Sequence, residues 1–409
     1  MKVIYFAEHF DTPITGGGLR PYQMARRLIS AGHQVTMVCG GDQAWLGLPS
    51  SDKKNIYRGD VEGIDVIQIS IPYSNNDSIA KRAVIFLKFA WKAMGYAMKE
   101  DYDLLFATST PLTDGLPGIV AKWFRKKKFV FEVRDLWPEL PKALGLKNPF
   151  LLWGMSVLEK RSYHAADACV GLSPGICEGI RRRSQKGKRI AMIPNGCDLD
   201  LFTLSKMKPD VIPGVKPTDT VAVFTGTHGV ANGLDAVLDM AAVLKARLRD
   251  DIKIVFVGEG NMKAHLKERA QNEGLTNCLF LDRMPKKALN DVMARADIGL
   301  MVLANVPAFY YGTSPNKFFD YIASGLPVVN NYPGWLADLI HENNCGIAVA
   351  PENPELFAEA LVNLAEHPEL REAYGANGRK LAEREFARDL LGSEFVRFLE
   401  ETYNGNVKC

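Results

Sequence analysis

The sequence predicts an α/β protein made of two Rossmann-like domains, each built on a doubly wound parallel sheet. Two observations predict this class. The chain has 409 residues, and because a single hydrophobic core stops growing at about 250 to 300 residues, two domains are expected. Short β-prone runs also alternate with stretches of helical periodicity in both halves. That alternation is typical of a parallel sheet covered by helices on both faces.

The alternation places the expected elements along the chain. In the first half, strands are expected at 3–7, 35–39, 64–69, 104–108, 128–133 and 168–172. A helix is expected from Pro21 to Ala31, because apolar residues recur there with helical spacing and Gly32 follows. In the second half, strands expected at 221–225, 253–257, 278–281 and 298–302 alternate with helices at 234–247, 262–273 and 287–295.

The pattern pauses where prolines and glycine gather, between residues 204 and 218. We therefore predict an N-terminal domain over 1–203, a linker over 204–218, a C-terminal domain over 219–385 and a final helix over 386–409 that packs back towards the N-terminal domain. Open parallel sheets bind ligands beyond the carboxyl ends of their strands. Functional residues are therefore expected in the loops that follow the strands.

Composition argues against several other classes of protein. The seven cysteines are scattered without a C-x-x-C pair, which argues against a disulfide framework or a zinc cluster. A net charge of +3 gives no indication of nucleic-acid binding. The first apolar run is too short for a signal peptide, and no later run reaches membrane-spanning length. We expect a cytoplasmic protein without a metal or another cofactor.

The segment from Ser314 to Val329 is the strongest candidate for a binding site. Ser314 is expected to be the N-cap of a helix with Pro315 at its first position. Gly325 is expected to end this helix, and Pro327 to begin a strand. A helix N-terminus presents unpaired N–H groups and partial positive charge, which suit a diphosphate, and Lys317 adds a full charge.

Asp320 follows Lys317 by three residues on the same helical face. Its carboxylate could accept hydrogen bonds from both hydroxyls of a ribose. The alternative is an ordinary surface Lys–Asp pair on a capped helix, and the residues alone leave both interpretations open.

This segment resembles the nucleotide-sugar motif of retaining glycosyltransferases of family four, which have the GT-B fold of two Rossmann-like domains facing a cleft. Four other segments are similar to the family: Gly16-Gly17-Gly18 with Arg20, Pro194-Asn195-Gly196-Cys197-Asp198, Val257-Gly258-Glu259-Gly260 and Ala296-Asp297-Ile298. The likeness covers nearly the whole chain. The run from Arg134 to Glu139 and the S-P-x-K start of the Ser314 helix together resemble the branch that assembles bacterial O-antigen and capsule repeats, including N-acetyl-L-fucosamine transferases.

The resemblance implies a site for a nucleotide diphosphate sugar, expected to be UDP-linked. The donor-binding residues that it implies are Gly16, Gly17, Gly18, Arg20, Gly226, His228, Arg283, Gly312, Thr313, Ser314, Asn316, Lys317 and Asp320. Two positions depart from the family. Gly312 replaces a usual acid, so backbone N–H groups of Gly312 and Thr313 are expected to meet the sugar. After the first strand of the second domain, the family often has a basic pair that binds the phosphates. This chain offers only His228 and Asn232 there, so Lys317 and Arg283 are expected to supply the positive charge instead.

The first half carries two weaker signals. Gly16 to Gly18 lie between the first strand and a helix, where the backbone can approach a ligand, although a three-glycine turn alone is more often plain loop chemistry. Arg134 and Asp135 follow a strand. Asp135 is expected to orient the acceptor, and the alternative is that it pairs with Arg134 or caps a helix.

The resemblance also implies a mechanism. Retaining members are thought to react on the donor's front face, with the leaving diphosphate taking the acceptor proton. Catalysis would then rest on positioning and on stabilising the leaving charge, and we assign it to Asp135, Arg134 and Lys317.

Two segments predict contact with a membrane. Residues 79–98 combine a stripe of lysines with many apolar residues, and residues 123–129 mix cations with aromatics. A solvated helix packed on the sheet is the alternative. We expect a peripheral protein on the inner face of the cytoplasmic membrane.

Together these features predict a retaining glycosyltransferase that moves a sugar from a nucleotide diphosphate to a lipid-linked or polysaccharide glycan during O-antigen, lipopolysaccharide or capsule biosynthesis. Two alternatives remain open: a nucleotide-sugar epimerase, and a non-catalytic nucleotide-sugar-binding partner.

Overall fold

The computed structural model describes residues 1–13, 15, 18–41, 46–51, 55–72, 79–143, 145–202, 204 and 208–405. The chain forms two compact units. The first comprises Met1–Pro194, Gly312–Ser314 and Asp389–Cys409, and the second comprises Asn195–Tyr311 and Pro315–Arg388. The domain limits expected from the sequence stay predictions.

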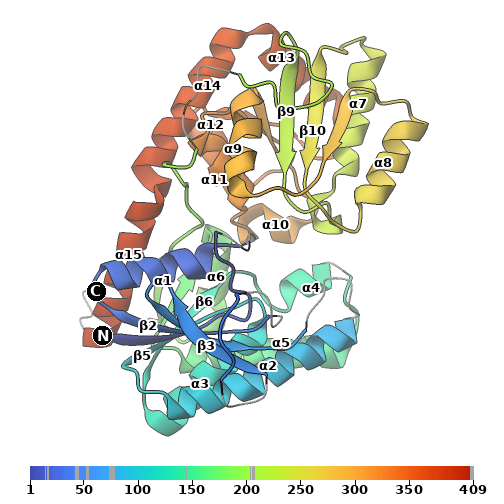
Figure 1. Cartoon of the computed structure of the whole chain (residues 1–409). Helices are drawn as coiled ribbons and strands as arrows, with labels where there is room; N and C mark the ends of the chain where they lie inside the picture. The colour runs from blue at the N-terminus through green and yellow to red at the C-terminus, as the bar shows by residue number, and fades with distance from the viewer. Residues whose placement is uncertain are drawn as a thin grey trace. The chain divides into compact units, whose positions relative to one another are not determined.

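The first unit is built on an eight-stranded sheet in the order β3-β4-β2-β1-β5-β6-β7-β8 (Figure 1). All neighbouring strands pair in parallel except β3, which runs antiparallel to β4. The strands are β1 (Lys2–Phe6), β2 (Gln34–Cys39), β3 (Ile56–Val61), β4 (Ile64–Ile69), β5 (Leu104–Thr108), β6 (Lys128–Val133), β7 (Ala168–Gly171) and β8 (Arg189–Met192).

Helices cover both faces of this sheet. The helices are α1 (Arg20–Ser30), α2 (Ile79–Lys99), α3 (Gly115–Arg125), α4 (Glu139–Ala143), α5 (Pro149–Ala165), α6 (Pro174–Arg183) and α15 (Arg388–Asn404). Successive side chains of a strand point to opposite faces. Ile4 and Phe6 of β1 therefore pack in a core with α2, α3, α5 and α6. Val3 and Tyr5 pack in a second core with α1 and α15.

The second unit contains a six-stranded parallel sheet in the order β11-β10-β9-β12-β13-β14. Its strands are β9 (Thr220–Thr225), β10 (Ile252–Val257), β11 (Cys278–Leu281), β12 (Ile298–Met301), β13 (Val328–Asn330) and β14 (Gly346–Ala348). Its helices are α7 (Asp235–Ala246), α8 (Lys263–Asn272), α9 (Lys286–Arg295), α10 (Pro307–Gly312), α11 (Asn316–Ala323), α12 (Trp335–Glu342), α13 (Pro354–Glu366) and α14 (Pro368–Leu381).

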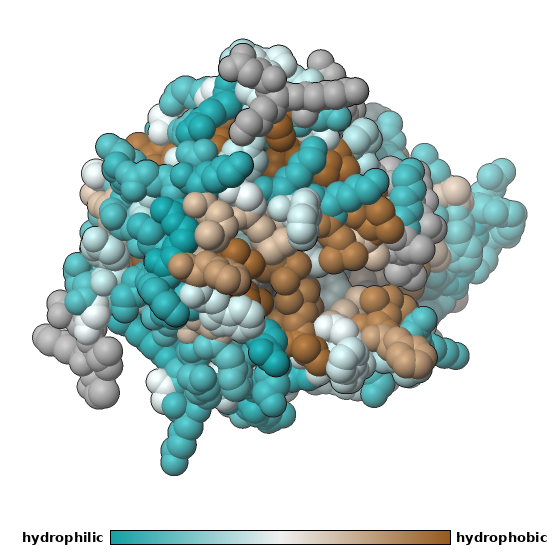
Figure 2. Space-filling view, turned by 90° about the horizontal axis from the view of Figure 1, so that it is seen from below, coloured by the Kyte–Doolittle hydropathy of each residue, from teal (hydrophilic) through white to brown (hydrophobic). Residues whose placement is uncertain are grey.

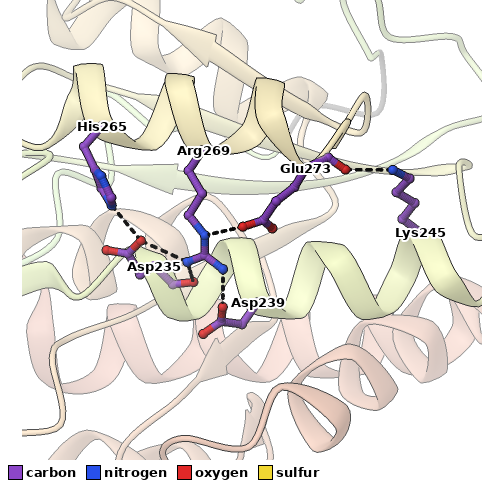
Figure 3. Close-up of polar contacts among 6 residues, drawn as sticks. All are labelled: Asp235, Asp239, Lys245, His265, Arg269 and Glu273. Carbon is purple, nitrogen blue, oxygen red and sulfur yellow. Dashed lines mark hydrogen bonds and ion pairs between the residues drawn. The ribbon is translucent and has the colours of Figure 1, made fainter.

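Arg269 ties α8 to α7 in this unit (Figure 3). Its guanidinium donates to Asp235 over 2.9 Å and to Glu273 of its own helix over 2.7 Å, and it also binds Asp239. His265 contacts the same Asp235 carboxylate over 3.0 Å. These groups are partly solvated, so the network fixes the orientation of α8 while each pair contributes at most about 1 kcal/mol.

The expected fold class is confirmed, since both units are parallel-sheet α/β structures. Every expected strand is present with shifts of about one residue. Strands β3, β8 and β14 were missed. β3 contains Arg58, Gly59 and Asp60 in an exposed edge hairpin, so it lacks the continuous apolar run of a buried strand. β8 and β14 have only 4 and 3 residues, and none of these residues is buried.

Two further expectations from the sequence concern disulfide bonds and membrane-spanning helices. The cysteines within the described ranges, which exclude Cys409, are free. Among the helices of the described residues, none has the length and apolar character needed to cross a bilayer.

Candidate functional site

Helix α11 begins at Asn316, one residue later than predicted. Pro315 occupies the N-cap position in an extended conformation and makes no side-chain cap hydrogen bond, so the prediction of Ser314 as N-cap is wrong. The reason is that the Pro315 carbonyl accepts the first turn's hydrogen bond, from the Phe318 N–H over 3.2 Å. The N–H groups of Asn316 and Lys317 in this first turn have no intrahelical acceptor, as at any helix start.

Lys317 lies beside the loop that follows β9. Its side chain is almost fully buried, with Nζ 2.6 Å from the Asn232 side-chain oxygen and 4.2 Å from the centre of the Phe224 ring. A Cβ placed on Gly226 would lie 3.4 Å from Cε of Lys317. Burial lowers the pKa of Lys317 to about 7. Within the described part of the chain the amine has no anionic partner, so a bound anion would restore its charge.

Asp320 does not pair with Lys317. Its carboxylate lies 3.3 Å from Nζ of Lys286, which also donates to Asp198 over 2.8 Å. Arg388 completes the network by binding Asp198. Burial raises the pKa of Asp320, although the Lys286 charge opposes this rise. The alternative of a surface Lys–Asp pair is therefore wrong, because both side chains are buried and each has another partner.

Asp198 belongs to the Asn195-Gly196-Cys197-Asp198 motif that the sequence analysis singled out. Burial favours its neutral form, but the charges of Arg388 and Lys286 outweigh burial and hold the pKa of Asp198 below its usual value. Sequence reasoning missed Lys286, since it lies 34 positions from Asp320 and opens another helix. Its place near the carboxyl end of β11 was the signal available.

The loops after β9 and β10 pack backbone against backbone. Gly226 has φ of 138° and Gly258 has φ of 148°, and a Cβ on Gly258 would lie 1.9 Å from the Gly226 carbonyl oxygen. Only glycine allows this approach. His228 donates its N–H to the Glu259 carbonyl over 2.8 Å, which fastens the two loops together.

The His228 ring lies among Phe224, Phe256 and Phe280, with ring centres 6.0, 6.1 and 6.4 Å away. Neither ring nitrogen has a hydrogen-bond partner among the described residues. Burial, assisted by the charge of Lys263, lowers the pKa of His228 to about 4. The imidazole is therefore neutral at physiological pH and adds no positive charge for a phosphate.

The remaining donor-binding candidates are only partly positioned. Gly16 and Gly17 lie outside the described residues, and the Gly18 N–H donates to Asp11 over 3.0 Å. Arg283 is exposed in the loop between β11 and α9. Gly312 ends α10, and Thr313 and Ser314 connect it to α11. The structure thus brings together the first turn of α11, Gly226 and Asn232.

Arg20 is buried in the first unit and bonded to protein groups. It donates to Glu132 over 3.0 and 2.8 Å and to the carbonyls of Ile193 and Pro194 over 2.7 Å each. Glu132 also accepts a 2.7 Å bond from Thr108. Through these contacts Arg20 joins α1 to the ends of β6 and β8.

Arg134 and Asp135 follow β6, as predicted. The Arg134 N–H donates to the Ser109 hydroxyl over 2.9 Å, and Asp135 accepts a 3.2 Å bond from the Thr110 hydroxyl. Asp135 therefore does not cap α4, which begins at Glu139. Burial raises the pKa of Asp135, while the Arg134 charge and the Thr110 bond oppose this rise.

Two buried acids nearby were missed by sequence reasoning. The Glu8 N–H donates to the Asp114 carboxylate over 2.9 Å. Glu8 Oε2 and Asp114 Oδ1 have no hydrogen-bond partner among the described residues. Burial raises the pKa of both groups, and the Asp114 charge raises that of Glu8 further. The signal for Glu8 was its place just after β1, where functional residues gather.

No metal centre is indicated in the part of the chain that the structure describes. Nowhere in it do three or more His, Cys, Asp or Glu side chains converge as metal ligands would. The first turn of α11 instead carries the cationic side chain of Lys317, which suits an anion.

Comparison with protein families identifies the chain as a nucleotide-sugar-dependent glycosyltransferase. The family "Glycosyl transferases group 1" matches residues 210–381, and "Glycosyl transferase 4-like domain" matches residues 15–196. The two matches together span most of the chain. The protein belongs to the group-1, family-four glycosyltransferases and is an enzyme of that class.

The relatives are distant. WcaI of Escherichia coli (strain K12), whose assignment as a colanic acid biosynthesis glycosyl transferase is itself provisional, is 23% identical over 97% of this chain and 99% of its own. The O-antigen chain mannosyltransferase C of Escherichia coli is 23% identical over 58% of this chain and 62% of its own. A GDP-mannose-dependent phosphatidylinositol monomannoside mannosyltransferase of Corynebacterium glutamicum is 25% identical over 51% of this chain, and the match spans 55% of that protein. None of these three is named for N-acetyl-L-fucosamine.

Solved structures share the fold over the whole chain. Sucrose-phosphate synthase from Thermosynechococcus elongatus gives a TM-score of 0.76 at 17% identity, over 99% of this chain and 100% of that one. WaaG, a glycosyltransferase involved in lipopolysaccharide biosynthesis, gives 0.70 at 17% identity over 97% and 99%. Anabaena HepE in complex with UDP gives 0.68 at 16% identity over 98% and 100%. The expected GT-B architecture is confirmed.

Proposed function

We propose that this enzyme is a retaining glycosyltransferase that transfers a sugar from a UDP-sugar to a lipid-linked or polysaccharide glycan in cell-surface glycan biosynthesis. The observation that carries the proposal is the buried Lys317 amine at the first turn of α11, whose hydrogen-bond partner among the described residues is the neutral Asn232 side chain. The donor diphosphate would bind the N–H groups of Asn316 and Lys317 and restore the charge of the amine.

Other residues have narrower functions in the proposal. Asp320 would accept hydrogen bonds from the ribose hydroxyls while Lys286 holds its carboxylate in place. Asp135, fixed by Thr110, would orient the acceptor hydroxyl. The complex of Anabaena HepE with UDP supports a uridine donor, and the relatives named for colanic acid and O-antigen support a surface glycan as the product.

The proposal is tested by turnover with an acceptor. The protein is incubated with a panel of UDP- and GDP-sugars and short lipid-linked glycans, and the products are weighed by mass spectrometry. We expect one acceptor to gain the mass of one sugar, with the anomeric configuration retained by NMR. Conversion of the donor without an acceptor would favour the epimerase, and donor binding without any turnover would favour the non-catalytic partner.

Donor binding is also expected to take up a proton. Because the pKa of Lys317 in the free protein is about 7, the amine is almost wholly neutral at about pH 8.5, and the diphosphate would bind its charged form. Calorimetric titration with UDP in two buffers of different ionisation enthalpy should report uptake of about one proton. Affinity should fall as the pH rises above 7. Equal heats in both buffers would contradict the assignment of Lys317 to the diphosphate.

A further inference from the structure

Three helices of the first unit leave an aromatic face without a partner in the described chain. Helices α2, α3 and α5 lie side by side, with α3 in the middle, on one face of the eight-stranded sheet (Figure 1). We propose that the outer face of these helices binds the surface of an anionic lipid bilayer. The face is defined by Leu87, Trp91, Trp123, Phe124, Phe150 and Trp153. This face belongs to the first unit, whereas the proposed contacts of Asn316, Lys317 and Asp320 with the donor belong to the second.

The exposure of these side chains is the first observation. Trp91 is 75% exposed, Phe124 is 72%, Phe150 is 84% and Trp153 is 69%. Figure 2 shows hydrophobic side chains gathered across this side of the molecule, with hydrophilic groups around them. Single exposed apolar residues are ordinary, but a contiguous patch of this kind marks a binding surface.

The third helix, α5, was not singled out in the sequence and extends the surface. Phe150, Trp153 and Val157 follow one another at intervals of three and four residues, so they form one stripe along the helix. The opposite stripe, with Glu159 and Tyr163, is buried against the sheet core. The helix therefore has two apolar faces, and only one of them is used within the unit.

Charge identifies the occupant. Within α2, α3 and α5 the only acidic residue is Glu159, which is fully buried and lies 2.6 Å from Arg183. Lys81, Lys88 and Lys99 of α2 are exposed. A face with tryptophan, phenylalanine and lysine but no exposed acid is complementary to negatively charged headgroups over an apolar layer. Each lysine near such a surface contributes about 1 kcal/mol.

Lysine and tryptophan also suit the boundary of a bilayer for a geometric reason. The lysine stem covers apolar surface while its ammonium group stays among the headgroups. Tryptophan combines an apolar ring with an N–H donor, so it favours the same depth. A second copy of this chain would place lysine against lysine across a symmetric contact, which charge repulsion opposes.

Vesicle binding tests the proposal. The full chain is sedimented with vesicles of phosphatidylcholine alone, or with about a quarter phosphatidylglycerol, in about 0.1 M salt. We expect binding to the anionic vesicles and at least about tenfold weaker binding to the neutral ones. The double variant Phe150→Ser/Trp153→Ser should lose about tenfold or more of the binding. The charge variant Lys88→Glu/Lys99→Glu should lose its preference for anionic vesicles.

The matched control is Leu248→Ser, because Leu248 of the second unit is 84% exposed and lies outside this face. It should bind vesicles like the unchanged protein. Tryptophan fluorescence should be quenched by brominated lipids, and less so in Trp153→Phe. Absence of vesicle binding, or equal loss in Leu248→Ser, would overturn the proposal. The proposal would also be overturned if light scattering showed a dimer that the Phe150→Ser/Trp153→Ser substitutions dissociate. The face would then bind a second copy of the chain.

The same variants separate this proposal from the proposed function. Phe150→Ser/Trp153→Ser should retain the UDP affinity and the melting temperature of the unchanged protein, since both side chains are exposed in the first unit. If the unchanged protein binds UDP but does not bind vesicles, the lipid-surface proposal is rejected and the proposed function is not affected.

Discussion

Lys317→Met is expected to lower turnover by about 100-fold to 1000-fold, because it removes a charged donor aimed at the leaving diphosphate. The affinity for UDP should fall by about tenfold to 100-fold, as for the loss of a hydrogen bond to a charged group. Methionine keeps the apolar stem over the Phe224 ring, so packing is preserved. Both effects are measured by steady-state kinetics and by titration with UDP.

The stability of the Lys317→Met variant should not fall with its turnover and UDP affinity. The pKa of Lys317 is lowered to about 7 by burial, so between pH 7 and its ordinary value the unfolded chain binds the extra proton. The free energy of unfolding of the unchanged protein therefore rises with pH across that window. Lys317→Met should melt at an equal or higher temperature at pH 7, and its advantage should shrink as the pH rises.

A surface lysine provides the control for this variant. Lys380 of α14 is exposed in the same unit, and Lys380→Met should leave both turnover and UDP affinity unchanged. A Lys317→Met enzyme with full turnover would refute the function assigned to this residue. Loss of turnover together with a lower melting temperature would indicate a structural function instead.

Arg20→Ala is expected to destabilise the first unit by about 3 to 5 kcal/mol, because it leaves the Glu132 carboxylate buried without its cation. Glu132 is fully buried, and Arg20 is its ion-pair partner at 2.8 Å. Urea unfolding measures the loss of stability, and hydrogen exchange at the amides of β1 and β6 would assign that loss to this unit. The double variant Arg20→Met/Glu132→Leu should recover much of the stability, since it removes both charges.

A solvated pair gives the matched comparison. Arg247 pairs with Glu355 at the surface of the second unit, and Arg247→Ala should cost less than about 1 kcal/mol. Unchanged stability in Arg20→Ala together with weaker UDP binding would show that Arg20 binds the donor, as the family resemblance implied.

The sheets could be predicted because their strands are continuous apolar runs. All residues of β5 and β9 are buried, as a parallel sheet covered on both faces requires. The edge strand β3 could not be predicted, because Arg58 and Asp60 interrupt the apolar run and only its hairpin partner β4 makes it a strand. A short polar edge depends on pairing rather than on its own composition.

The candidate site could be predicted only in part. The position of Lys317 at a helix start follows from local chemistry, namely a proline before a helical run and a glycine after it. Its partner Asn232 lies 85 positions away and joins it only when β9 and α11 come together in the fold. The burial that lowers its pKa likewise arises from packing against Phe224. The pairing of Asp320 with Lys286 has the same tertiary origin.

A crystal structure of the protein with bound UDP tests the donor site most directly. We expect the diphosphate within hydrogen-bond distance of the N–H groups of Asn316 and Lys317 and of the Lys317 ammonium, with the ribose beside Asp320. A nucleotide bound elsewhere in the second unit, with the Lys317 amine still held by Asn232 alone, would contradict the proposed donor site.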